Sequence, residues 1–195
     1  LEENSVAICD TFVQTWFASC IRTDIKKLDS QGKLKSGQLG GGRTGGNLKY
    51  EMKKVRGDRV GWFSGKEAGC ENIRALITLI DYFVYLLAQR LKELGESHLE
   101  RQEAMVTCYP GGGARYIKHC DNPNDNGRVL TCVFYCNVGW EEGSGGQLRV
   151  HSEDGKFRDI EPLPGRLVVF FSDKRVPHEV IPCERHRYAV TVWYL

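Results

Sequence analysis

Apolar residues recur at helical spacing in two stretches of the N-terminal half of the chain. The first follows Asp10, a favourable N-cap residue, and ends near Gly32; it contains Phe12, Val13, Trp16, Phe17, Cys20, Ile21 and Leu28. The second runs from Glu71 to Leu94, with Gly95 as its stop, and contains Ile73, Leu76, Ile77, Ile80, Val84, Leu87 and Leu91. We expect two amphipathic helices that pack on a sheet.

From Ala104 onward the pattern changes to short β-rich segments separated by turns such as Asp125-Asn126-Gly127, Gly143–Gly146 and Asp154-Gly155. The predicted strands are Ala104–Tyr109, Ala114–His119, Val129–Asn137, Gln147–Val150, Arg166–Phe171, His178–Ile181 and Tyr188–Tyr194. Helices followed by many short strands predict an α+β fold, a β-sandwich or jelly-roll barrel buttressed by helices. Residues 1–100 would form the helical support and residues 104–195 the barrel core.

Composition places the chain among ordinary globular proteins. Its 195 residues suit one domain, with 41% hydrophobic and 27% charged residues and a formal charge of +2. The basic excess is small and dispersed, and no long apolar run or secretory signal is present, so we expect neither nucleic-acid nor membrane binding. The first residue is Leu1, which favours a domain cut from a longer protein.

The eight cysteines are scattered and include no CxxC pair. Four disulfides would suit a small secreted protein, but several of these cysteines fall inside predicted helices or strands. Reduced thiols in the cytoplasm, the nucleus or both are therefore expected.

Five glycines interrupt the stretch from Leu39 to Asn47, which has no apolar periodicity. Two interpretations stand side by side: a plain surface connection, or a mobile lid over a site. The stretch lacks the Gly-Lys-Ser/Thr ending of a phosphate-binding loop.

His119 and Asp121 are two residues apart, so in an extended segment their side chains project to one face. His178 lies at the entry to another predicted strand and can complete a set of two imidazoles and one carboxylate. That set is typical of non-haem iron(II) oxygenases, whereas a structural zinc site would be closed and richer in cysteine. An HxD motif alone can arise by chance. His178 alone can be a histidine packed in the core.

Arg187 follows the second histidine and alternates with Ala189, Thr191 and Trp193 on one strand face. A guanidinium placed inside a barrel is costly unless it is paired, and its planar fork suits a carboxylate. An acidic small molecule beside the metal is the implied partner.

The segments around these residues make the pattern specific. They are Tyr109-Pro110-Gly111, the run from Tyr116 to Pro123, the run from Asp173 to Val180, and the run from Arg187 to Tyr194, with Arg56-Gly57-Asp58, Trp62 and Gly69-Cys70-Glu71 further upstream. In this order, over nearly the whole chain, they resemble the catalytic domain of the hypoxia-inducible-factor prolyl hydroxylases. The resemblance implies a double-stranded β-helix of the jelly-roll or cupin type, with iron(II), 2-oxoglutarate and oxygen as cofactor and co-substrates, and ascorbate as reductant.

The resemblance also implies a role for each matching residue. His119, Asp121 and His178 would bind the metal, and Arg187 with the Tyr135 hydroxyl would hold the distal carboxylate of 2-oxoglutarate. The remaining co-substrate positions would be Tyr109, Leu148, Thr191 and Val180, and the substrate positions Arg128, Tyr116, Trp193, Arg56 and Asp58. For the apolar members plain core packing remains an equal explanation, and for Arg128 an exposed turn position does.

The implied activity is hydroxylation of C4 of a proline by a monomeric oxygen-sensing enzyme. The substrate would be a Leu-x-x-Leu-Ala-Pro-like segment of the transcription factor's α-subunit, over which residues Leu39 to Asp58 would fold. The extra glycines and Lys49–Lys54 depart from the family pattern and leave substrate selectivity open.

Two alternatives remain at this point. The enzyme could hydroxylate a prolyl residue of another protein, such as a ribosomal protein, or the barrel could be a non-catalytic module that binds iron and 2-oxoglutarate. Collagen-type prolyl hydroxylases fit less well, because they use a lysine where Arg187 stands.

Overall fold

The structure is a computed structural model that describes residues 1, 5–37, 55–94 and 99–195. Its helices are α1 (Thr15–Ser30), α2 (Glu71–Ala88) and a short 3-10 helix, η1 (Lys92–Leu94). The larger sheet has the spatial order β1 (Val6–Cys9), β9 (Leu167–Phe171), β6 (Leu130–Tyr135), β11 (Arg187–Tyr194), β4 (Ala104–Tyr109), β3 (Arg59–Phe63) and β2 (Lys35–Ser36). The smaller sheet has the order β5 (Ala114–His119), β10 (His178–Cys183), β7 (Leu148–His151) and β8 (Phe157–Ile160).

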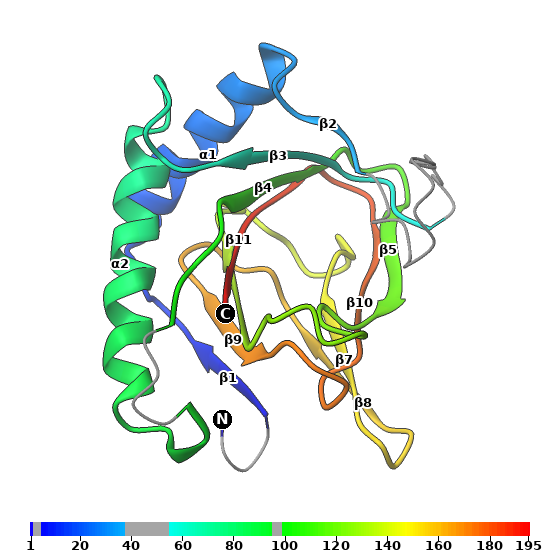
Figure 1. Cartoon of the computed structure of the whole chain (residues 1–195). Coiled ribbons are helices and arrows are strands. Elements are labelled where there is room, and N and C mark those ends of the chain that lie inside the picture. The colour runs from blue at the N-terminus through cyan, green and yellow to red at the C-terminus, as the bar shows by residue number, and fades with distance from the viewer. Residues whose placement is uncertain (2–4, 38–54, 95–98) are drawn as a thin grey trace, which may run out of the picture.

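The two sheets face each other, and the helices lie against the outer face of the larger one (Figure 1). All pairings between neighbouring named strands are antiparallel. Strands far apart in sequence become neighbours, as when β10 is inserted between β5 and β7. This arrangement confirms the predicted double-stranded β-helix with helical support.

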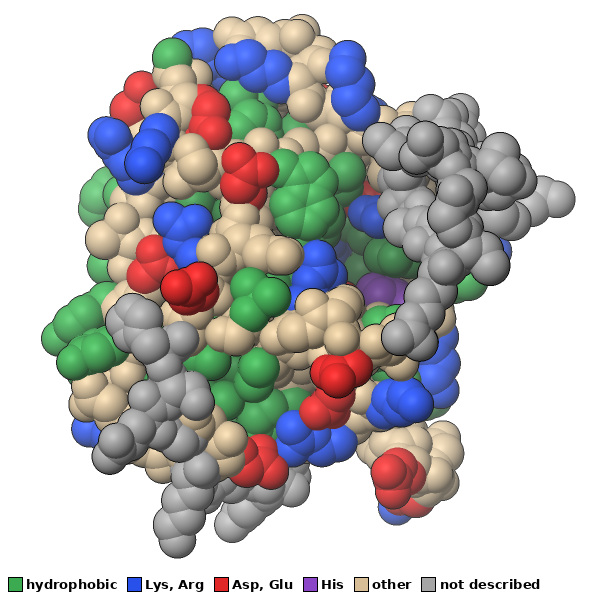
Figure 2. Space-filling model, in the orientation of Figure 1, with side chains coloured by type: hydrophobic (Ala, Val, Ile, Leu, Met, Phe, Trp, Pro, Cys, Tyr) green, Lys and Arg blue, Asp and Glu red, His purple; other side chains and the backbone are tan. Residues whose placement is uncertain are grey.

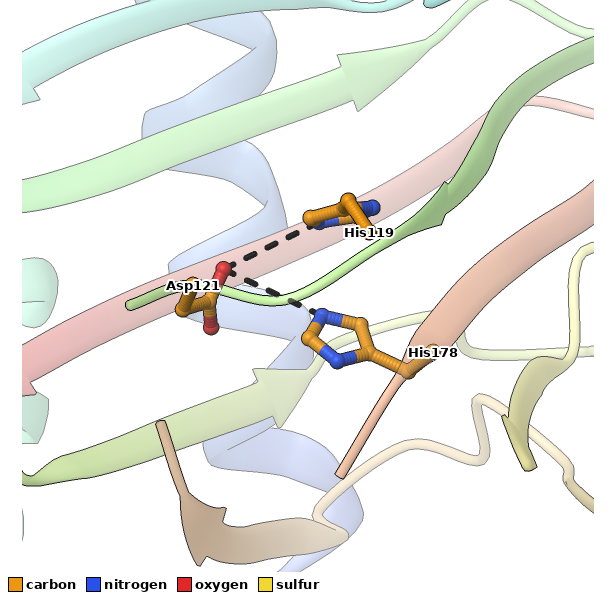
Figure 3. A group of neighbouring side chains, drawn as sticks. All are labelled: His119, Asp121 and His178. Atoms are coloured by element: carbon orange, nitrogen blue, oxygen red, sulfur yellow. Dashed lines mark ion pairs between the residues drawn. The ribbon is translucent and has the colours of Figure 1, made fainter. Parts of the chain in front are cut away.

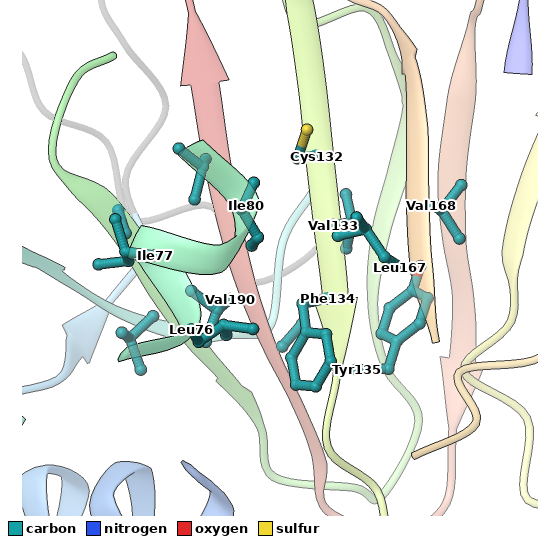
Figure 4. Packing of buried hydrophobic residues seen from close by; sticks show 14 of the residues in the cluster. Leu76, Ile77, Ile80, Cys132, Val133, Phe134, Tyr135, Leu167, Val168 and Val190 are labelled. Carbon is teal, nitrogen blue, oxygen red and sulfur yellow. The ribbon is translucent and has the colours of Figure 1, made fainter. Parts of the chain in front are cut away.

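The core lies between the helices and the larger sheet. Ile77 and Ile80 of α2 are at most 1% exposed and belong to the same buried cluster as Phe134 and Val190 of the sheet (Figure 4). Burying one such side chain contributes about 1.5–3 kcal/mol. The opposite face of β6 and β11 therefore faces the smaller sheet. The polar side chains of the candidate site lie between these two sheets.

Both helices differ from the prediction at one end. The first begins at Thr15 after Gln14 rather than after Asp10, whose carboxylate instead pairs with Arg166. The second ends at Ala88 rather than at Leu94. Leu91 and Leu94 are still buried, but from a turn and η1, so the apolar spacing continues beyond the helix itself.

Four strands were given no bounds in the prediction: β1, β2, β3 and β8. Each is at most five residues long, and Gly61 interrupts the apolar pattern of β3. The glycine-rich stretch Leu39–Asn47 lies outside the described residues.

Two findings bear on the compositional predictions. All eight cysteines are free thiols. In the described part of the chain, neither helix combines the length and the apolar character that crossing a bilayer requires.

Candidate active site

Strand register brings the two predicted histidines together. His119 ends β5, His178 begins β10, and the antiparallel pairing of these strands sets them directly opposite each other. Asp121 follows two residues after His119, and its Oδ1 lies 3.7 Å from His119 Nε2 and 3.8 Å from His178 Nε2 (Figure 3). The three side chains offer ligand atoms within 4.8 Å of one another, as a shared metal ion requires.

Backbone carbonyls orient both imidazoles. His119 Nδ1 lies 2.8 Å from the Ile117 carbonyl oxygen, and His178 Nδ1 lies 2.9 Å from that of Val176. A carbonyl oxygen can only accept, so each Nδ1 carries a proton, and a neutral ring of this tautomer presents the lone pair of Nε2. Metal-binding histidines are commonly oriented in this way.

A chain of hydroxyl groups holds Asp121. Thr131 Oγ1, on β6, donates to Asp121 Oδ2 at 2.7 Å and lies 2.8 Å from Ser172 Oγ at the end of β9. The second carboxylate oxygen is therefore occupied, and Oδ1 is turned toward the histidines.

The site favours a neutral His119 beside an ionised Asp121 carboxylate. Burial and the neighbouring His178 lower the pKa of His119 to about 4. Burial opposes ionisation of Asp121, but the two histidines and the Thr131 hydrogen bond outweigh it and lower the pKa of the carboxyl. These protonation states and the three ligands on one side fit an iron(II) ion that keeps positions open for other ligands.

The triad lies in a cavity of about 490 Å³ between the two sheets. Figure 2 shows histidine on the floor of a hollow on this face, with basic and hydrophobic side chains around it. The volume suits a small co-substrate together with part of a second molecule.

Arg187 supplies the cavity's deepest positive charge. The residue is 2% exposed, its Nε donates to the Gly146 carbonyl oxygen at 2.8 Å, and it forms no ion pair with a carboxylate in the described part of the chain. Its guanidinium lies 5.0 Å from the ring centroids of both Tyr109 and Tyr135. A buried cation without an anionic partner is costly, so the pocket is suited to a carboxylate ligand.

Tyr135 adds a hydrogen-bond donor beside that charge. Its hydroxyl oxygen is buried, and the O–H has no hydrogen-bond acceptor among the described residues. Burial raises the pKa of this phenol, although Arg187 opposes the shift, so the hydroxyl keeps its proton and can donate. Arg187 and Tyr135 together match one end of a dicarboxylate whose other end lies at the metal.

Aromatic and basic side chains surround the triad. Tyr116 stacks on His119 with ring centroids 3.8 Å apart, and the Arg56 guanidinium lies 4.5 Å from the Tyr116 ring. On the other side, the Arg128 guanidinium lies 4.1 Å from the Trp193 ring. Flat aromatic rings and positively charged guanidinium groups thus surround the triad.

Of the predicted site residues, all but Asp58 line the cavity: His119, Asp121, His178, Arg187, Tyr135, Tyr109, Leu148, Thr191, Val180, Arg128, Tyr116, Trp193 and Arg56. Asp58 instead accepts from Arg56 Nε at 2.8 Å and from Arg56 Nη2 at 2.6 Å. Its carboxylate supports the cavity wall indirectly, by holding Arg56.

Sequence reasoning missed several contributors, among them Thr131, Met105, Thr107 and Ser172. Met105 and Thr107 line the cavity beside Tyr109, and their spacing of two along β4 was an available signal. Ser172 gave no signal, because it reaches Thr131 only through the pairing of β6 with β9.

Comparison with known proteins agrees with this geometry. Residues 104–195 match the model of the 2OG-Fe(II) oxygenase superfamily. The chain is 42% identical over 197 residues to human prolyl hydroxylase EGLN3, with all of this chain and 80% of the relative covered.

Two solved structures are similar along the whole chain. One is a prolyl hydroxylase in complex with a hypoxia inducible factor oxygen degradation domain peptide fragment from Trichoplax adhaerens, with TM-score 0.88, 35% identity and 85% of that chain covered. The other is a Pseudomonas putida prolyl-4-hydroxylase, with TM-score 0.81, 30% identity and 94% of that chain covered.

Proposed function

Because the chain belongs to the prolyl hydroxylase family of the 2-oxoglutarate- and iron(II)-dependent oxygenases, we propose that it hydroxylates C4 of a prolyl residue in the hypoxia-inducible factor α-subunit. Such an enzyme would couple the stability or activity of a transcription factor to oxygen. The proposal includes ascorbate as the reductant that keeps the iron in its ferrous state.

One observation carries the enzymatic part of the proposal. Among the described residues, the same cavity is lined by a His-Asp-His triad, by Arg187, which has no ion-pair partner, and by the Tyr135 hydroxyl, which has no acceptor. A site that binds only a metal ion has no need of the buried guanidinium of Arg187. Their combination matches a metal-chelating dicarboxylate, which is what 2-oxoglutarate is.

The residues divide the work as follows. His119, Asp121 and His178 would hold the iron, and Arg187 with Tyr135 would bind the distal carboxylate of the co-substrate by charge-assisted hydrogen bonds. When bound, iron(II) and 2-oxoglutarate supply the oxidising chemistry, in which oxygen is consumed, 2-oxoglutarate becomes succinate and carbon dioxide, and a C–H bond becomes C–OH.

The protein's remaining task is to orient the proline and exclude water. Trp193, Tyr116 and the guanidinium of Arg128 present flat surfaces around the triad on which a pyrrolidine ring can pack. Arg56, held by Asp58, would extend that surface toward the rest of the peptide. Tyr109, Leu148, Val180 and Thr191 would enclose the co-substrate.

Mass spectrometry tests the proposal directly. The protein is incubated with iron(II), 2-oxoglutarate, ascorbate, oxygen and an α-subunit peptide containing Leu-x-x-Leu-Ala-Pro. We expect the peptide to gain one oxygen atom on that proline and to gain none when the proline is replaced by alanine. Asp121→Ala protein is the enzyme control and should leave the peptide unmodified.

The result also separates the alternatives. Modification of a ribosomal-protein peptide but not of the α-subunit peptide would retain the reaction and change the substrate. Loss of 2-oxoglutarate without modification of any peptide, or no turnover at all, would contradict the proposal.

We further propose that the whole chain is one catalytic domain that acts as a monomer in the cytoplasm, the nucleus or both, without binding nucleic acid or membranes. The continuous core cluster, which joins both helices to the barrel strands, supports a single domain. The free cysteines support a reducing compartment. Sedimentation of the purified chain tests the oligomeric state.

A further inference from the structure

A second hollow, of about 470 Å³, lies behind the co-substrate end of the active site. Arg187 lines the first cavity, and Tyr188, the next residue of β11, lines the second. Successive residues of a strand point to opposite faces, so β11 forms a wall between the two. The second hollow is therefore distinct from the active site but adjacent to it.

The lining of this hollow is strongly basic. Arg22 and Lys26 come from α1, and Arg185 and His186 come from the turn between β10 and β11. No carboxylate is among its lining residues in the described part of the chain. Glu141 reaches Arg185 at 3.2 Å but is 78% exposed, so solvent weakens this pair.

Two of these cations are fixed in place by backbone carbonyls. Arg22 Nη1 donates to the Val138 oxygen at 2.9 Å, and Arg185 Nη1 donates to the Gly139 oxygen at 3.0 Å. Each bond uses part of a guanidinium that carries five donor hydrogens. Both residues thus keep donors and full charge for a ligand, while the loop after β6 holds their position.

The positive charges of Arg22, Lys26 and Arg185 repel one another in the protein alone. Arg22 and Lys26 are four residues apart on one face of α1, where like charges repel and destabilise a helix. Their repulsion adds to that from Arg185 across the hollow. A bound anion would remove this repulsion, so the arrangement favours ligand binding.

Trp140 provides an aromatic wall of the hollow. The residue lines the hollow, and its indole nitrogen is buried without an acceptor in the described part of the chain. The indole N–H is a donor without an acceptor at this wall, so its resonance reports a ligand that binds in the hollow.

We propose that this hollow binds a small, multiply charged oxyanion, a phosphate or polycarboxylate compound, at a site separate from that of 2-oxoglutarate. Both sources carry the negatively charged oxygens that Arg22, Lys26 and Arg185 can bind, with His186 beside them. Its position behind Arg187 places the ligand next to the strand that holds the co-substrate.

Indole ¹H–¹⁵N resonances test this proposal on the complete protein. Zinc-loaded protein is first saturated with 2-oxoglutarate, so that the active site is filled, and is then titrated at constant ionic strength. Pyrophosphate and propane-1,2,3-tricarboxylate are the two probes, one for each source. The chain has four tryptophans, and the Trp140 signal is identified by its loss in Trp140→Phe protein.

We expect a saturable shift of the Trp140 resonance with at least one probe. Replacing Lys26 and Arg185 together by glutamine should lower the affinity for that probe about tenfold, because charge-assisted hydrogen bonds are lost. The matched control is Lys27→Gln with Arg158→Gln, which removes two exposed charges that do not line the hollow and should retain the wild-type affinity.

Three results would overturn the proposal. They are an absence of any Trp140 shift with both probes, a shift that never saturates, and equal weakening by the two pairs of substitutions. Equal weakening would mean that the anion is attracted by the overall positive charge of the protein and does not bind specifically in this hollow.

Discussion

A single hydroxyl determines which oxygen of Asp121 faces the histidines. Thr131 donates to Oδ2 at 2.7 Å and is itself in contact with Ser172. We expect Thr131→Val to weaken metal affinity about 10- to 100-fold, the usual effect of removing a group that orients a metal ligand. Competition with a fluorescent chelator under anaerobic conditions measures the effect independently of turnover.

Thr107→Val is the matched control for this substitution. Thr107 lines the same cavity, but its hydroxyl has no hydrogen-bond partner among the described residues. Its removal should leave metal affinity within about twofold, because no ligand loses its support. Equal losses in the two variants would show that Thr131 acts through cavity shape and not through Asp121.

Arg187 should act on co-substrate binding rather than on the metal. Arg187→Ala removes a buried charge-assisted pair with 2-oxoglutarate and should cost about 2–5 kcal/mol of its binding free energy. Titration of zinc-loaded protein with 2-oxoglutarate measures this change. Metal affinity should stay at the wild-type value, and unchanged 2-oxoglutarate affinity would refute the assignment.

Local spacing explains why the triad and Arg187 could be found in the sequence. The two-residue separation of His119 and Asp121, and the alternation from Arg187 to Trp193, fix which side chains share a face. Thr131 and Ser172 meet only because β6 pairs with β9, about 40 residues later in the chain. Support of this kind depends on tertiary structure, and no sequence period encodes it.

At the level of elements, β3 and the segment just before it carry two Arg–Asp pairs of unequal burial. The Arg56–Asp58 pair has side-chain exposures of 8% and 0%. The Arg59–Asp29 pair, which links β3 to α1, has exposures of 34% and 19%. Burial opposes the charge of Arg56, but its hydrogen bonds to Asp58 outweigh it and raise the pKa of the guanidinium.

The two pairs should therefore differ in their contribution to stability. Asp58→Ala removes one partner of a buried pair, which costs about 3–5 kcal/mol. Asp29→Ala breaks a partly solvated pair and should cost about 1 kcal/mol or less. Urea unfolding of both variants measures their free energies of unfolding. Similar losses in the two variants would mean that the buried Arg56–Asp58 pair stabilises the fold no more than the partly solvated Arg59–Asp29 pair does.

The elements that could be predicted from the sequence are long enough to show a regular spacing of apolar residues. The 18-residue helix α2 keeps five buried positions at helical spacing, so its existence was predictable. The two-residue β2 and the four-residue β1 have too little sequence for any period, and β1 forms only by pairing with β9. Their hydrogen-bond partners lie far away in the chain.

At the scale of the molecule, the active site joins the two sheets. His119 and His178 belong to the smaller sheet, while Thr131, Tyr135 and Arg187 belong to the larger one. A metal ion and a dicarboxylate bound together would bridge the sheets across the cavity. Ligand binding should therefore stabilise the whole fold, since ligands that bind only the folded state shift unfolding by mass action.

Thermal unfolding tests that coupling. With zinc and 2-oxoglutarate each added at 100 times its dissociation constant, each ligand should contribute about 2.7 kcal/mol. For a chain of this length, each such step raises Tm by about 5–10 °C, from about 2–4 °C for each kcal/mol. Asp121→Ala protein should lose the metal increment and most of the 2-oxoglutarate increment, because 2-oxoglutarate binds partly through the metal, whereas Arg187→Ala protein should keep the metal increment and lose most of the other. An equal response of the two variants would contradict a site in which one end holds the metal and the other the distal carboxylate.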